Sequence, residues 1–149
     1  KEKEGITGEV LKWYTGLNPE TEWELQQARA ATAKYRFDTV KAYQDGYRNI
    51  SVDVENMGHH FLKAEYVDGT FDIRHPELLV YNGTHEGNME LVAVEYAVPI
   101  NQPEPPGFTG TNDVWDHNTT FQLWLLHAWV WRFNPSGVFN PLNPDVHLH

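Results

Sequence analysis

The sequence contains no cysteine. Disulfides, thiolate metal sites and cysteine nucleophiles are therefore excluded, and any metal site has to use histidine and carboxylate ligands. Serine is scarce as well, since the chain has only Ser51 and Ser136, and neither lies in a nucleophile elbow. A glycine-rich phosphate loop is also missing. These absences remove several common types of active site.

Basic residues are few, with 11 Lys and Arg against 21 Asp and Glu, so the formal net charge is −10. Nucleic acids and anionic membrane surfaces would be approached against this field, which excludes them as expected partners and favours cations or metal ions. The chain also lacks a long apolar run. Even the segment 121–131 contains Gln122 and His127, so the sequence predicts no membrane span.

A length of 149 residues with 40% apolar composition predicts one domain over residues 1–149. The aromatic content of 13%, with six tryptophans, indicates a packed interior or an aromatic-lined cavity. The first residue is Lys1 rather than Met, which favours removal of a leader and hence a secreted or cell-surface protein. Asn-X-Ser/Thr sequons at Asn49, Asn82 and Asn118 agree with a secreted glycoprotein, although an asparagine-rich chain also collects sequons by chance.

Helix signals come early in the chain. Asn18 before Pro19 is a typical N-cap followed by proline in the first turn, and Asp38 is a second cap. We therefore expect helices over about 19–35 and 38–45, preceded by an extended arm over residues 1–17. Gly46 ends the second helix.

Strand signals follow from residue 47 onward. β-Branched and aromatic residues with intervening turns predict strands over about 50–54, 59–63, 77–81, 89–98 and 121–132, with a hairpin at Asn82-Gly83. The segment 99–120 contains four prolines and no periodicity, which predicts a long loop of the kind used as a lid, a binding loop or a partner arm. The predicted class is α+β, with an N-terminal helix pair packed on a curved antiparallel sheet and a pocket between helices and concave face. A cystatin or NTF2-like cone is one form of it, and a cupin-like sandwich is the alternative.

Alternation along the strands sorts the side chains by face. In 121–132, His127 lies in the middle of a row whose other members are apolar: Phe121, Leu123, Leu125, Trp129 and Trp131. In 89–98, Glu95 lies between Ala93 and Ala97 on one face. A carboxylate buried there without a partner would cost several kcal/mol, so something has to compensate it.

His60, Glu95 and His127 are thus ligand-type residues in the middle of three separate strands, and they predict a two-histidine, one-carboxylate metal site. Zinc, copper and iron are the expected divalent transition metals. Glu55 is expected as a fourth ligand or as a partner that orients an imidazole, and Asp116 and His117 can close over the site. The alternative is structural, with core histidines hydrogen-bonded to a carboxylate or a carbonyl.

Three segments carry a resemblance: Glu55 to Phe61, Val94-Glu95-Tyr96, and 126–137 with Leu126-His127 at its start. Together they resemble a family of small, mostly uncharacterised exported microbial proteins with the pattern E-x-M-G-x-H-Y, V-E-Y and L-H-x-W-x-W-R-x-N-P-x-G. The resemblance covers residues 24–145, with Phe61 in place of the usual tyrosine. It implies that Glu55, His60, Glu95 and His127 belong to one pattern, and it implies no activity.

The sequence thus predicts an exported metal-binding protein or metalloenzyme. A second hypothesis is a non-catalytic structural or assembly subunit that self-associates through its proline-rich loop and terminal arms. A third is a carrier of an apolar small molecule in a pocket lined by Trp129 and Trp131.

Overall fold

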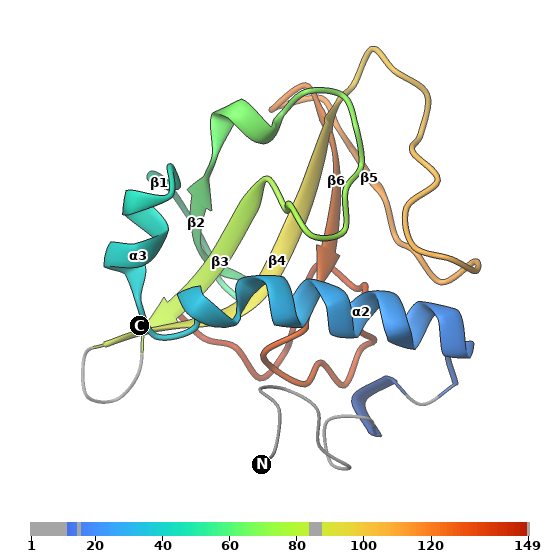
Figure 1. Ribbon diagram of the computed structural model, residues 1–149, viewed down its shortest axis with the longest axis horizontal. Helices are drawn as coiled ribbons and strands as arrows, with labels where there is room; N and C mark the ends of the chain where they lie inside the picture. Colours follow the sequence, from blue (N-terminus) through green and yellow to red (C-terminus); the bar gives the residue numbers. More distant parts are fainter. Residues whose placement is uncertain (1–11, 15, 84–87, 149) are drawn as a thin grey trace.

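The computed structural model describes residues 12–14, 16–83 and 88–148 (Figure 1). Two α-helices, α2 (Pro19–Thr32) and α3 (Thr39–Gln44), precede the sheet. The strands are β1 (Arg48–Val54), β2 (Gly58–Leu62), β3 (Leu78–Gly83), β4 (Met89–Pro99), β5 (Asp116–Asn118) and β6 (Leu123–Ala128). Short 3-10 helices are η1 (Lys12–Tyr14), η2 (Ala33–Tyr35) and η3 (Ala64–Tyr66).

Helix α2 begins where the sequence predicts. The side chain of Asn18 accepts a hydrogen bond from the Thr21 backbone N–H at 2.8 Å, and Pro19 occupies the first turn. Leu25 and Ala28 are its fully buried apolar residues, and they belong to the main core. The second helix, α3, has six residues, and Ala42 is its only buried one, so the helical layer over the sheet consists chiefly of α2.

The six strands form one antiparallel sheet in the order β1-β2-β3-β4-β6-β5. The predicted α+β class with a curved antiparallel sheet is confirmed, and β3 and β4 pair antiparallel as predicted. Asn82 and Gly83, which were expected in the turn, are instead the last two residues of β3, and residues 84–87 lie outside the described part. The three-residue strand β5 was not predicted, because it lies inside the long loop. Strand β6 ends at Ala128 rather than at residue 132.

Two register shifts bend the sheet into a half-barrel. One lies in β1 between Asn49 and Asp53, where Ser51 has a φ of 59°. The other lies in β4, where Val92 is the extra residue between the pairs Val80–Ala93 and Tyr81–Leu91. Such bulges bend a strand and increase its twist. As a result, β1 and β5 at the two edges of the sheet both contribute side chains to one cavity on the concave face.

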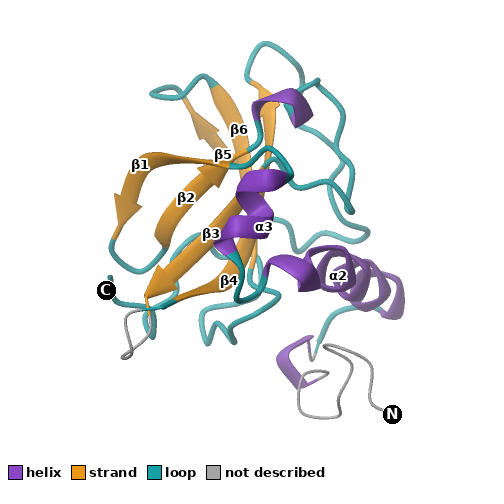
Figure 2. Cartoon of the chain, turned by 60° about the vertical axis from the view of Figure 1, so that its left-hand side comes forward, coloured by secondary structure: helices purple, strands orange, loops and turns teal. Residues whose placement is uncertain are grey.

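Helix α2 covers the opposite, convex face (Figures 1 and 2). Leu79, Val94 and Leu126 pack in the same core cluster as Leu25 of α2, whereas Glu95 and Leu125 point to the other side of the sheet. The expected pocket between helices and concave face is therefore wrong. Alternate residues of a strand face opposite ways, so the apolar row that packs on α2 leaves the row with Glu95 on the helix-free side.

Both long irregular segments are packed rather than extended. In the loop over 99–120, Phe108 is buried in the main core, and the Glu24 carboxylate accepts hydrogen bonds from the N–H and hydroxyl of Thr109 at 2.7 and 2.6 Å. Near the C-terminus, Val146 is 1% exposed and packs in one cluster with Trp129. This tail closes one end of the concave face beside Trp129.

Of the predicted arm over 1–17, residues 1–11 and 15 lie outside the described part, and Tyr14 is buried in the core. Within the described part, no helix is both long and apolar enough to cross a membrane.

Candidate metal centre

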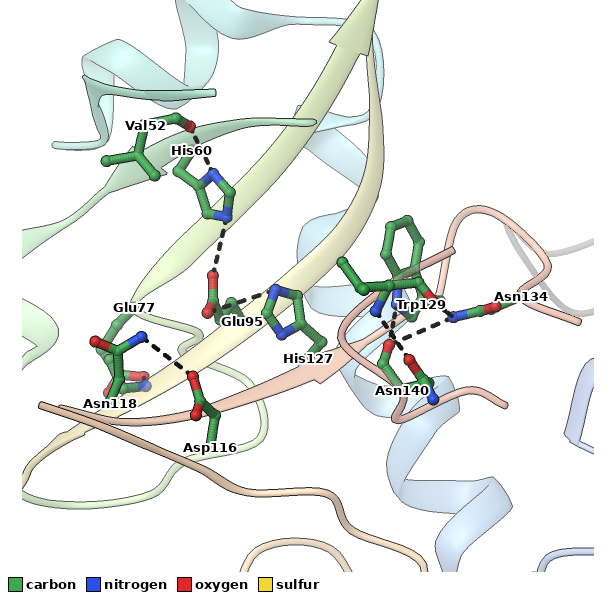
Figure 3. A network of polar contacts seen from close by, with 12 residues as sticks. Val52, His60, Glu77, Glu95, Asp116, Asn118, His127, Trp129, Asn134 and Asn140 are labelled. Atoms are coloured by element: carbon green, nitrogen blue, oxygen red, sulfur yellow. Dashed lines mark hydrogen bonds and ion pairs between the residues drawn. The ribbon is translucent and has the colours of Figure 1, made fainter. Parts of the chain in front are cut away.

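The three predicted ligands meet on the concave face of the sheet (Figure 3). His60 lies on β2, Glu95 on β4 and His127 on β6. Glu95 and His127 are directly paired across neighbouring strands, while β3 separates His60 from both and places Val80 opposite it. The curvature of the sheet is what brings the imidazole of His60 over β3 to Glu95.

The distances within this cluster are suited to a shared ion. His60 Nε2 lies 3.4 Å from Glu95 Oε1, and His127 Nε2 lies 3.5 Å from Glu95 Oε2. One ligand atom from each of the three residues lies within 4.8 Å of the other two. Two ligands that are each about 2.1 Å from a tetrahedral metal ion are about 3.4 Å apart, whereas direct hydrogen bonds are usually about 2.7 to 3.0 Å long.

The tautomer of His60 is fixed by the backbone of β1. His60 Nδ1 lies 2.7 Å from the carbonyl oxygen of Val52, which can only accept, so Nδ1 carries the hydrogen of the neutral ring. Nε2 therefore presents its lone pair toward Glu95. An imidazole oriented by a carbonyl through its other nitrogen is the usual arrangement at a metal ligand.

The cluster is buried, and its polar atoms are poorly satisfied. His60, Glu95 and His127 are between 2% and 4% exposed. Glu95 Oε1 and His127 Nε2 have no hydrogen-bond partner among the residues that the structure describes. Buried polar atoms without a partner cost free energy, and a cation between them would satisfy both.

Burial also sets the charges of these three side chains in the metal-free form. Loss of solvation raises the pKa of Glu95 to about 8, with a smaller contribution from the Asp116 carboxylate. Burial lowers the pKa of His127 to about 3, and it lowers the pKa of His60 as well. At neutral pH the metal-free cluster is therefore uncharged, with a proton on Glu95 and two neutral imidazoles.

A cavity of about 370 Å³ opens directly from the cluster. Its wall consists mainly of aliphatic side chains from both halves of the sheet, including Val52, Leu62, Leu78 and Leu125. The row Ile50, Val52, Val54 on β1 also lines it, and sequence reasoning missed this role. The apolar residue at every second position was the available signal.

Other predicted site residues lie elsewhere. The prediction that Glu55 is a fourth ligand or orients an imidazole of the site is wrong. Its carboxylate instead accepts hydrogen bonds from His147 Nδ1 at 2.6 Å and from the Leu148 N–H at 3.1 Å. It is not part of the cluster and holds the C-terminal tail instead. Asp116 lines the cavity as expected, but the ring of His117 packs on Trp124 with centroids 4.6 Å apart.

The predicted row of β6 breaks after Ala128. The Val130 N–H donates to the Ala128 carbonyl, which turns the chain, and Trp131 Nε1 donates to Thr32 Oγ1 at the end of α2. Trp131 therefore faces α2 and not the cavity. Trp129 packs against the tail, so the expected Trp-lined pocket is wrong, because both indoles are used in core packing.

The three sequon asparagines differ in their surroundings. Asn49 is exposed on β1, and Asn118 lines the cavity, where its amide donates to Asp116. Asn82 is 6% exposed and its amide donates to the His147 carbonyl at 2.7 Å. A glycan would replace one of the two hydrogens on this nitrogen, and the burial of Asn82 leaves little room for it in the folded chain.

No family model, curated protein or solved structure matches the chain. The resemblance drawn from the three sequence segments therefore stays a prediction. What the cluster does has to be inferred from its own geometry.

Gly58 positions the cluster, and its replacement tests this. It has a φ of +132°, and a Cβ there would lie 2.4 Å from the carbonyl oxygen of Tyr81 on β3. Since His60 is two residues away, Gly58→Ala is expected to destabilise the fold by about 2 kcal/mol or more and to weaken metal binding. Urea unfolding and metal titration measure the two effects.

Gly137→Ala is the matched control for this substitution. Gly137 also has a positive φ, +119°, but a Cβ there would meet nothing within 4 Å. It carries the same backbone strain without the clash. Equal destabilisation in the two variants would show that contact with β3 is not what requires glycine at position 58.

Proposed function

We propose that this protein binds one divalent transition-metal ion per chain through His60, Glu95 and His127. The observation that carries the proposal is the spacing of the two Glu95–imidazole contacts, 3.4 and 3.5 Å, between atoms of which two lack any hydrogen-bond partner in the described structure. Zinc, iron and copper all accept imidazole and carboxylate ligands.

The structural alternative, a hydrogen-bonded core cluster, fits these distances less well. A protonated Glu95 could donate its hydrogen to His60 Nε2 and accept one from a His127 ring that carries its hydrogen on Nε2. Both separations, 3.4 and 3.5 Å, are however longer than ordinary hydrogen bonds of about 2.7 to 3.0 Å. A metal ion accepts lone pairs from all three side chains at once.

Three protein ligands leave at least one coordination position of the ion open. The ligands all come from the sheet, and the cavity adjoins the cluster, so the open position would face the cavity. Structural zinc sites are usually closed by four protein ligands, whereas catalytic ones keep a position for water or substrate. This supports a centre that acts on, or holds, a small molecule.

Metal stoichiometry tests the proposal. We expect tag-free protein stripped with chelator and titrated with zinc to bind one ion per chain, and we expect the His60→Ala/His127→Ala double variant to bind none. His59→Ala/His75→Ala is the matched control, because it also removes two histidines, and neither belongs to the cluster. Full binding by the cluster variant would disprove the assignment of the ligands.

Export, use of the sequons and self-association stay predictions from the sequence.

A further inference from the structure

We infer that the open position of this centre takes an uncharged, mainly apolar small molecule with a single donor atom. The inference rests on the proposed metal site and names what would occupy the cavity beside it. The size, the lining and the charge of the cavity each limit the ligand.

The volume of about 370 Å³ lies near the lower end of the range for small-molecule pockets. A polymer chain or a folded partner would not fit. Ile50 and Phe121 line the cavity and are 38% and 50% exposed. They therefore form its outer rim, Ile50 from strand β1 at one edge of the sheet and Phe121 from the turn between β5 and β6 at the other. We place the entrance of the cavity between them, because the other apolar residues of its wall are partly or fully buried.

The side chains that line the cavity favour a mainly apolar ligand. Apart from the metal ligands, the described residues of the wall include two polar ones, Asp116 and Asn118, and Asn118 donates its amide hydrogen to Asp116. A sugar or another ligand with many hydroxyl groups would lose hydrogen bonds to water that this wall cannot replace. A hydrocarbon chain loses none and gains about 0.8 kcal/mol for each buried methylene.

The charge count favours a neutral donor. A divalent ion carries two positive charges, and the carboxylates of the buried Glu95 and of Asp116, an exposed residue of the cavity wall, carry two negative ones, so the loaded site is neutral overall. No lysine or arginine occurs among the described residues that line the cavity. An anionic head group would leave a net negative charge in an apolar enclosure, and a cationic one would face the metal ion.

Cobalt-loaded protein with two neutral probes tests this. We expect 1-hexylimidazole to change the visible absorption of bound cobalt and to bind at least 30-fold more tightly than 1-methylimidazole, since both offer the same donor and differ in chain length. Hexanoate, with a similar chain and a charged head, is expected to bind at least tenfold more weakly than 1-hexylimidazole.

The rim variant Ile50→Glu/Phe121→Glu is expected to weaken 1-hexylimidazole binding at least tenfold more than it weakens 1-methylimidazole binding. Val40→Glu is the control, because Val40 is an exposed apolar residue of α3 outside the cavity. Far-UV circular dichroism checks that each variant is folded.

The outcomes separate the two proposals. Failure to bind cobalt would disprove the metal site itself. Cobalt binding with equal affinity for the two imidazoles would leave the metal site standing and disprove the apolar ligand. Tighter binding of hexanoate than of 1-hexylimidazole would disprove that the ligand of this site is uncharged.

Discussion

Replacing Glu95 with glutamine is expected to weaken metal binding by about 100-fold or more and, at the same time, to stabilise the metal-free protein at alkaline pH. The loss of affinity follows from the loss of the only anionic ligand in the cluster. The gain in stability follows from burial, because an ionised carboxylate at this position is unfavourable, whereas the amide is neutral at every pH.

The sign of the pH effect is set by the pKa of Glu95, which is about 8 in the folded chain against an ordinary value of 4.5. Between these two values the folded chain holds a proton that the unfolded chain has lost. Folded wild type therefore loses stability relative to the variant as the pH rises through this window, by about 1.4 kcal/mol for each pH unit. Glu77, whose pKa burial also raises to about 8, is present in both proteins and cancels in the comparison.

Urea unfolding in the presence of a chelator, repeated across this pH window, measures the difference. Glu90→Gln is the matched control, since Glu90 lies on the same strand and forms a partly exposed ion pair with Arg36. A stability difference between wild type and Glu95→Gln that does not change with pH would show that the buried carboxylate is not protonated in the metal-free protein.

The second large effect is the pH dependence of metal affinity in the wild type. Burial holds the pKa of His127 at about 3 and lowers that of His60, so neither imidazole is a strong proton acceptor near neutrality. Glu95, with its pKa of about 8, has to lose a proton before it can bind the ion. We therefore expect the affinity to rise about tenfold per pH unit from about pH 5 to pH 8, and to level off above it.

Calorimetry in buffers of different ionisation enthalpy checks this, because about one proton should be released for each ion bound near pH 7. In Glu95→Gln the residual binding should release almost none. Release of two protons for each ion bound would instead indicate that an imidazole is charged in the metal-free protein.

Part of this site follows from local sequence alone. Glu95 lies between two alanines on one face of a strand, and His127 lies in an apolar row, so alternation predicts that each points into the protein. Such patterns depend on the two-residue period of a strand and need no knowledge of its neighbours. The N-cap at Asn18 is predictable for the same reason, since its hydrogen bond spans three residues.

Glu55 shows where local patterns stop being informative. It lies five residues before His60 and carries a suitable side chain, yet it binds the C-terminal tail. Trp131 shows the same limit. Strand β6 ends at Ala128 and the chain turns there, so Trp131 points to α2 and not to the face that alternation along the strand predicts. Both outcomes depend on contacts with segments that are distant in sequence.

The sequence by itself determined the α+β class with an antiparallel sheet, the absence of thiolate chemistry, and the three side chains that the cluster uses. Tertiary structure decided that they meet, because His60 reaches Glu95 only across β3 in a sheet bent by two bulges. It also decided that the site faces away from α2 and opens into an aliphatic cavity. The physical reason is that alternation fixes the face of each residue within its own strand, whereas strand order, register and curvature are set by packing between strands.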